Sequence, residues 1–125
     1  MSTNANWHCS TPSDHRAYAG VWGGVNFKTC IVKGTTSGAK AQAVLVIQNK
    51  ARQHVYIEKG RILFESGRGG DVWCAASNLA PGATAGCFGP SVEMYDCETT
   101  TAAETWLTLL GKEQQGWKQA EYTPC

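Results

Sequence analysis

The sequence predicts an all-β protein, a two-sheet antiparallel sandwich of the immunoglobulin-like type, and three observations support this prediction. β-branched and aromatic residues gather in short stretches in which apolar and polar side chains alternate. Glycine, asparagine and proline interrupt these stretches at short, fairly regular intervals along the whole chain. Six cysteines in 125 residues indicate about three disulfides, which small β domains often use to supplement a limited core.

Residues 41–48 form the clearest strand, because Ala43, Leu45 and Ile47 share one face while the other face also carries two valines. A turn is expected at residues 49–52. Lys59-Gly60 is expected to turn the chain again after a half-exposed strand. The expected strands are residues 25–32, 41–48, 54–58, 61–64, 71–75 and 91–97.

Residues 101–110 allow two interpretations. Thr101 and Glu104 have the spacing of a helix-capping box, which favours one short helix ending at a glycine. The composition that follows, rich in threonine, tryptophan and leucine, instead favours a strand. In that case residues 111–116 form a hairpin loop, and residues 117–122 form the returning strand of the hairpin. We favour the hairpin.

The length fits one domain, since two independent cores would not fit in 125 residues. Residues 1–6 are polar and are expected to be a flexible tail, and residues 7–125 are expected to be a single disulfide-bonded β-sandwich domain. The glycine-rich residues 67–70 are expected to form a mobile loop.

The cysteines indicate the compartment. No two of them have the close spacing that zinc sites and redox centres use, so we interpret them as disulfides of a secreted, extracellular protein. Fifteen connectivities are possible for six cysteines. We favour pairing in chain order: Cys9 with Cys30, Cys74 with Cys87, and Cys97 with Cys125.

Charge and hydrophobicity exclude several partners. Eleven Lys and Arg against ten Asp and Glu leave a net charge of +1, which argues against a nucleic-acid partner. No apolar run approaches the length of a membrane-spanning helix, so no membrane insertion is expected. No phosphate-binding loop or other cofactor motif is present, and we expect no cofactor.

The sequence gives no support for catalysis, and we expect a protein that is not an enzyme. Ser13, Asp14 and His15 are the residue types of a hydrolytic triad, but sequence neighbours cannot adopt the triad geometry by themselves. We interpret them as a polar loop. His8, Cys9 and His15 are the only tight His/Cys group, and a bridged Cys9 could not bind a metal, so no metal site is expected.

Five tryptophans are many for a domain of this size. Trp22, Trp73 and Trp106 are assigned to the core, because apolar residues or glycine flank them. Trp7, beside His8, and Trp117 lie near the ends of the expected domain. They are either binding residues or covers for the ends of the sandwich.

The segment from Cys74 to Gly89, with its Leu79-Ala80-Pro81-Gly82 turn, resembles small secreted β domains of actinobacteria, as does the asparagine-ended strand 44–49. That group includes proteinaceous α-amylase inhibitors. The inhibitors' Trp-Arg-Tyr binding triplet is absent here, Val21-Trp22-Gly23 does not replace it, and six cysteines replace four, so amylase inhibition is not implied. The resemblance also extends to adaptor subunits of secreted toxin particles.

Three functions follow as expectations. The first is a non-catalytic adaptor or structural subunit that binds another extracellular protein, as in a toxin-like complex. The second is an inhibitor of a secreted hydrolase, whose disulfide-pinned loop presents Asn78, Leu79 and Pro81. The third is a carbohydrate-binding module in which Trp7, Trp117 and Tyr122 form a stacking surface for sugar rings.

Overall fold

The computed structural model describes residues 7–33, 40–64, 71–89, 92–93 and 100–121. In this part of the chain the structure is almost entirely strand, with a single short 3-10 segment, η1 (Arg16–Tyr18). The all-β prediction is therefore confirmed. No helix in these residues is long and apolar enough to cross a membrane.

The first sheet is antiparallel and is built on the long hairpin of β3 and β4, which pair over their whole lengths. Two short strands pair with β3 on one side, and two others pair with β4 on the other side. Its strands are β1 (Trp7–Cys9), β2 (Ser13–Asp14), β3 (Val25–Lys33), β4 (Lys40–Asn49), β9 (Thr84–Phe88) and β10 (Val92–Glu93).

The second sheet is also antiparallel, with the strand order β12-β11-β6-β7. β5 and β8, which precede β6 and follow β7 in the sequence, pair with each other in a separate two-stranded sheet. The strands are β5 (Val55–Ile57), β6 (Lys59–Phe64), β7 (Asp71–Cys74), β8 (Ser77–Leu79), β11 (Thr100–Leu109) and β12 (Lys112–Glu121).

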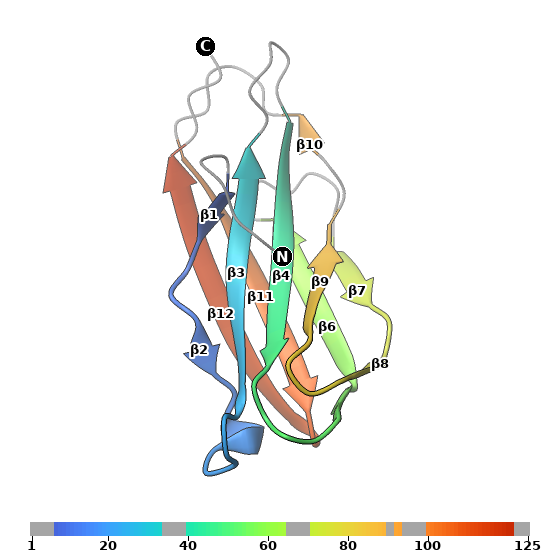
Figure 1. The fold of residues 1–125 in the computed structure, drawn as a ribbon. Helices are drawn as coiled ribbons and strands as arrows, with labels where there is room; N and C mark the ends of the chain where they lie inside the picture. The colour runs from blue at the N-terminus through green and yellow to red at the C-terminus, as the bar shows by residue number, and fades with distance from the viewer. Residues whose placement is uncertain (1–6, 34–39, 65–70, 90–91, 94–99, 122–125) are drawn as a thin grey trace.

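The two large sheets lie face to face, with β3, β4 and β9 in front of β12, β11 and β6 in Figure 1. β3 packs against β11 and β12, and β4 packs against β6. The inward residues form one core, since every second residue of β3, β4 and β11 is buried. Its largest fully buried apolar members are Phe27, Ile31, Leu45, Ile62, Leu107 and Leu109.

The hairpin interpretation of residues 101–110 is confirmed, because β11 and β12 pair in continuous register from Thr100–Glu121 to Leu109–Lys112. The expected loop over residues 111–116 is wrong. The turn consists of Leu110 and Gly111 alone, with φ angles of 50° and 74°. Two consecutive positive φ angles match the twist of the flanking strands, so strand pairing resumes at once.

The other strand predictions hold over most of their lengths, except that residues 91–97 are described only at Val92–Glu93, and the residues around Gly60 are the main difference. The expected turn at Lys59-Gly60 is wrong, because both residues lie within β6 and only Glu58 separates β5 from β6. A Cβ at Gly60 would lie 3.0 Å from both Cys74 Sγ and a methyl carbon of Leu45, so the glycine permits close packing rather than a turn. The expected tail at residues 1–6, the expected loop at 67–70 and residues 94–97 lie outside the described residues.

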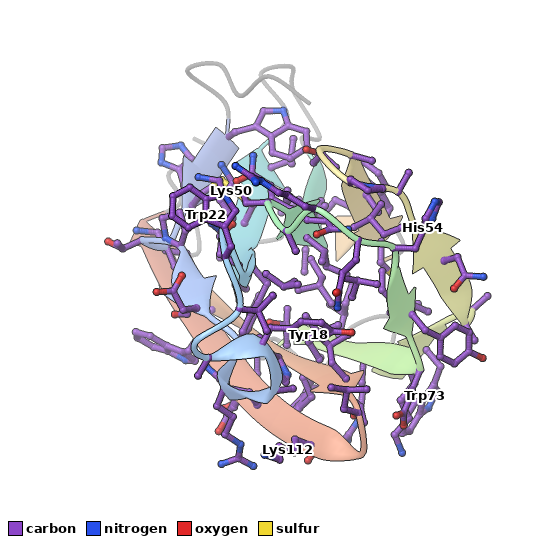
Figure 2. All side chains as sticks on the ribbon, turned by 60° about the horizontal axis from the view of Figure 1, so that its bottom comes forward. Tyr18, Trp22, Lys50, His54, Trp73 and Lys112 are labelled. Atoms are coloured by element: carbon purple, nitrogen blue, oxygen red, sulfur yellow. A yellow bond between two sulfur atoms is a disulfide. The ribbon has the colours of Figure 1, made fainter. Side chains whose placement is uncertain are left out.

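The assignment of three tryptophans to the core is wrong. Trp22 is 71% exposed and Trp73 is 59% exposed, and Trp73 lies at the edge of the molecule in Figure 2 while Tyr18 lies near its centre. Trp106 is half-buried on the outer face of β11, opposite the inward Thr105 and Leu107. Apolar neighbours are a poor guide here because the neighbours of a strand residue point to the other face.

Candidate functional site

Two disulfides lie within the described residues, and both confirm the expected pairing. Cys9 and Cys30 are directly opposite each other on β1 and β3, with Cα atoms 4.0 Å apart. Cys74 and Cys87 join β7 to β9. Cys97 and Cys125 lie outside the described residues, so their expected bridge stays a prediction.

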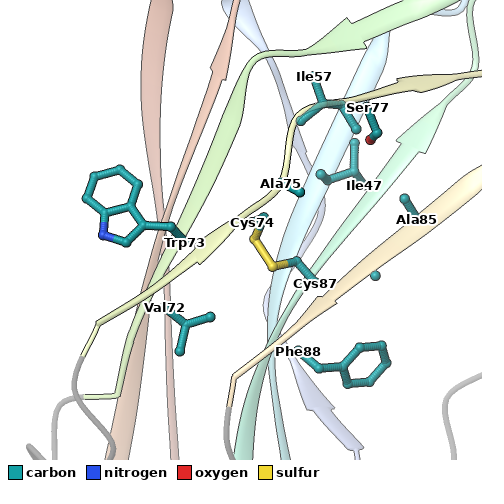
Figure 3. A pocket seen from close by; sticks show the side chains of 11 residues that line it. Ile47, Ile57, Val72, Trp73, Cys74, Ala75, Ser77, Ala85, Cys87 and Phe88 are labelled. Atoms are coloured by element: carbon teal, nitrogen blue, oxygen red, sulfur yellow. A yellow bond between two sulfur atoms is a disulfide. The ribbon is translucent and has the colours of Figure 1, made fainter.

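The Cys74–Cys87 disulfide spans the open side of the sandwich. β7 is an edge strand of the second sheet, and β9 belongs to the first, so this bridge links the two sheets where no strand hydrogen bonds do. Beside the bridge is a pocket of about 270 Å³, which we call the side pocket. Figure 3 shows Trp73 and Phe88 on opposite sides of the disulfide. The side pocket is lined by Ile47, Ile57, Val72, Trp73, Cys74, Ala75, Ser77, Ala85, Gly86, Cys87 and Phe88.

Asn49 fixes the segment that forms one rim of the side pocket. Its Nδ2 donates hydrogen bonds to the carbonyl oxygens of Gln53 and Leu79, at 2.8 and 2.9 Å. Its Oδ1 accepts from the backbone N–H of Ala51 at 2.9 Å. The backbone N–H of Gly82 donates to the carbonyl of Asn49 at 2.8 Å. The side chain and backbone of one buried residue therefore hold a turn, the end of β8 and the Pro81-Gly82 turn together.

The expected loop residues divide by burial. Asn78 and Pro81 are exposed at the surface, where they could contact a partner. Leu79 is buried and belongs to the core, so its proposed role as a contact residue is wrong. The segment is also more ordered than the single turn that the sequence suggested, because it contains both β8 and β9.

The expected stacking surface of Trp7 and Trp117 is not formed. Trp7 is half-buried on β1 and packs edge-on against Phe88, with ring centroids 6.3 Å apart. It joins Cys30, Val44 and Val46 in a small cluster on the outer face of the first sheet. His8 lies beside it on β1 and is half-buried. Trp117 lies on β12 of the second sheet, and Tyr122 lies outside the described residues.

A different group of tryptophans does come together. On the outer face of the second sheet Arg61 is directly opposite Trp73 on β7 and Trp106 on β11. Glu104, two residues from Trp106 on the same face, is directly opposite Trp117 on β12. We call this surface the tryptophan face, defined as Lys59, Arg61, Trp73, Glu104, Trp106, Gln115 and Trp117. From the sequence, the alternation within each strand indicates which residues share a face of that strand. It does not reveal that these four strands are neighbours, so the tryptophan face could not be predicted.

His15 does not lie in a polar loop, as the sequence suggested, but is 1% exposed. Its Nε2 donates to the carbonyl oxygen of Leu107 at 2.8 Å, and its Nδ1 accepts from the N–H of Ala17 at 3.1 Å. Both bonds require a neutral ring with its proton on Nε2. Burial lowers the pKa of His15 below 6.5, the hydrogen bond to Leu107 opposes this shift, and Arg16 adds to it. His15 therefore anchors η1 to β11.

The candidate metal group of His8, Cys9 and His15 is not available, because Cys9 is bonded to Cys30 and His15 is engaged inside the fold. Among the described residues there is no cluster of three or more His, Cys, Asp or Glu side chains that could hold a metal ion. Comparison of the chain with known protein families, with curated proteins and with solved structures found no match.

Proposed function

We propose that the protein is a secreted, non-catalytic domain that binds another extracellular protein at the side pocket. The observation that carries this proposal is the rigid construction of the pocket's rim. The Cys74–Cys87 bridge closes the segment between these two residues, and Asn49 binds it in the middle. A rim ordered in the free protein loses little conformational entropy on binding, which favours affinity.

The lining of the side pocket indicates what the partner supplies. Its walls are mostly apolar, and Trp73 and Phe88 flank it with large exposed surfaces. Tyr56 is exposed on β5, directly opposite Asn78 on β8. Exposed aromatic residues around an apolar depression are typical of the centre of a protein interface. We infer that one apolar side chain of the partner enters the pocket.

An adaptor and an inhibitor share this binding mode, and the adaptor is our first choice. The two disulfides are compatible with an extracellular protein, where both functions are common. The inhibitor is the alternative, since a disulfide-pinned loop is also a rigid plug for the active site of a hydrolase. The identity and fate of the partner distinguish them.

The test uses the immobilised protein and culture fluid of its source, followed by identification of the retained proteins. Ala75 lines the side pocket, and Ala76 is an exposed neighbour outside its lining, so Ala75→Arg and Ala76→Arg form a matched pair. We expect a stoichiometric partner that Ala75→Arg loses and Ala76→Arg retains. A partner that both variants retain equally would contradict the proposal. A captured hydrolase whose activity is lost would favour the inhibitor over the adaptor.

A further inference from the structure

The tryptophan face is a second surface, which shares only Trp73 with the lining of the side pocket, and two of its three tryptophans are exposed. Trp73 is 59% exposed and Trp117 is 49% exposed, although each could be covered by a longer neighbouring strand or loop. Leaving indole rings in water is unfavourable, because each ring carries a large apolar area. An exposed group of this kind on a folded domain indicates a binding surface.

The three tryptophans form a row across the strands. Trp73 and Trp106 are separated by Arg61 on the intervening strand, so their backbones are two strand spacings, or about 10 Å, apart. Trp117 is the diagonal neighbour of Trp106 on the next strand, about 7–8 Å away. The row is therefore elongated, and its shape fits a chain-like ligand.

Cationic side chains hold the rings in position. The guanidinium carbon of Arg61 lies 4.5 Å from the centroid of Trp106 and 5.5 Å from that of Trp73. Lys59 Nζ lies 5.5 Å from the centroid of Trp73. These cation–π contacts restrict the rotation of the indoles before any ligand arrives. A ligand that stacks on these indole rings therefore costs little additional side-chain entropy.

The polar residues among the rings distinguish between classes of ligand. The face carries charges of both signs, because Lys59 and Arg61 are accompanied by Glu104, and the exposed Glu113 lies beside them, opposite Thr108. Charged residues, especially Lys and Glu, are depleted at the centre of protein interfaces, but here they alternate with the rings. A sugar ring has an apolar C–H face and a rim of hydroxyl groups. It needs this alternation of aromatic faces with hydrogen-bonding side chains.

We propose that the tryptophan face binds an uncharged polysaccharide chain, with sugar rings stacked on Trp73 and Trp117 and with Glu104 and Gln115 hydrogen-bonded to hydroxyl groups. Arg61 is a positioning residue that holds Trp73 and Trp106. This proposal does not depend on the side pocket. Trp117, on the strand farthest from β7, carries its test.

The experiment measures retention of the full chain on insoluble cellulose, chitin, xylan and mannan, and titrates the soluble hexasaccharide of any polymer that retains it by tryptophan fluorescence. We expect Trp117→Ala to weaken binding about tenfold or more, as truncation of an aromatic contact residue that carries binding energy does. Trp117→Phe keeps an aromatic face and should bind in between. Trp22→Ala removes an even more exposed tryptophan outside the face and serves as the matched control.

Each outcome decides the proposal. Retention that Trp117→Ala abolishes and that Trp22→Ala and Ala75→Arg preserve would support a polysaccharide site distinct from the side pocket. Retention on none of the four polymers would overturn the proposal, as would equal losses in Trp117→Ala and Trp22→Ala. Loss of a captured protein in Trp117→Ala, without polysaccharide binding, would show that the face is a protein interface instead.

Discussion

The hydroxyl oxygens of Thr29 and Thr105 lie 2.8 Å apart between the two sheets and join β3 to β11 by a buried hydrogen bond. Both residues are fully buried. A Cβ at Gly116 would lie 2.7 Å from the hydroxyl of Thr29 and 2.9 Å from that of Thr105. The glycine of β12 therefore leaves the space that this polar pair occupies, and the pair is part of what sets the separation of the sheets.

The first prediction concerns the threonine pair itself. Thr29→Val leaves the hydroxyl of Thr105 buried without its partner, so we expect it to lower the free energy of unfolding by about 1–3 kcal/mol. The double variant Thr29→Val, Thr105→Val removes both polar groups and should cost less than the single variant. Urea unfolding followed by tryptophan fluorescence measures both. Simple additivity of the two substitutions would contradict the proposed coupling.

The second prediction is that Gly116→Ala destabilises the sandwich by about 1–3 kcal/mol, because the added methyl group overpacks the space beside the two hydroxyls. Glycine-to-alanine changes at unstrained, open positions stabilise proteins. A loss of stability in Gly116→Ala would therefore indicate overpacking. Combining Gly116→Ala with Thr29→Ala should restore part of the loss. The combined variant would be no more stable than Gly116→Ala if the clash lay elsewhere.

Alternation along single strands explains what could be predicted from the sequence. Ala43, Leu45 and Ile47 of β4 face the core, as their spacing indicates, and the β11–β12 hairpin follows from strand composition on either side of Gly111. The pairing of Cys74 with Cys87 also follows, because the turn between them returns the chain. All of these are local features.

The features that could not be predicted depend on which strands are neighbours. Trp73 lies between Val72 and Cys74, and this apolar run looks buried until β7 is paired with β6 and its middle residue is turned outward. The burial of His15 depends on Leu107, which is 92 residues away in the sequence. The tryptophan face needs the order β12-β11-β6-β7, which no local pattern specifies.

The third prediction concerns Asn49. Asn49→Ala removes the three hydrogen bonds of a buried side chain and leaves the carbonyl of Leu79 without this donor. We expect a loss of about 2–4 kcal/mol in the free energy of unfolding. Asn49→Asp keeps an acceptor for Ala51 but places a carboxylate against two carbonyl oxygens, so it should not rescue stability. Gln48→Ala, on the opposite face of β4, is the control and should change stability little.

The fourth prediction is a loss of stability in acid that depends on His15. The pKa of this ring is lowered in the folded protein, so the unfolded chain binds the proton more readily than the fold does. The neutral ring therefore contributes its full stability above about pH 6.5, and that contribution falls as the pH drops toward the folded-state pKa. Protonation of Nδ1 also removes the acceptor for the N–H of Ala17.

Urea midpoints measured from pH 8 to pH 5 test this prediction. Between these values we expect the midpoint of the unmodified protein to fall more steeply than that of His15→Gln, whose side chain has no ring to protonate. His54 is exposed, so His54→Gln should keep the steep dependence of the unmodified protein. Identical pH profiles for the unmodified protein and His15→Gln would show that another group is responsible.

The last prediction concerns the bridges. The intact mass of the unreduced protein should be lower than that of the reduced protein by about six hydrogens, because six cysteines then form three disulfides. A deficit of four would leave Cys97 and Cys125 as thiols and contradict the third pairing. Cys74→Ala with Cys87→Ala removes a bridge between residues 13 apart and should cost roughly 3 kcal/mol in the chain-entropy description. Because this bridge links the two sheets at their open side, its loss should also weaken partner capture at the side pocket more than polysaccharide binding through Trp117.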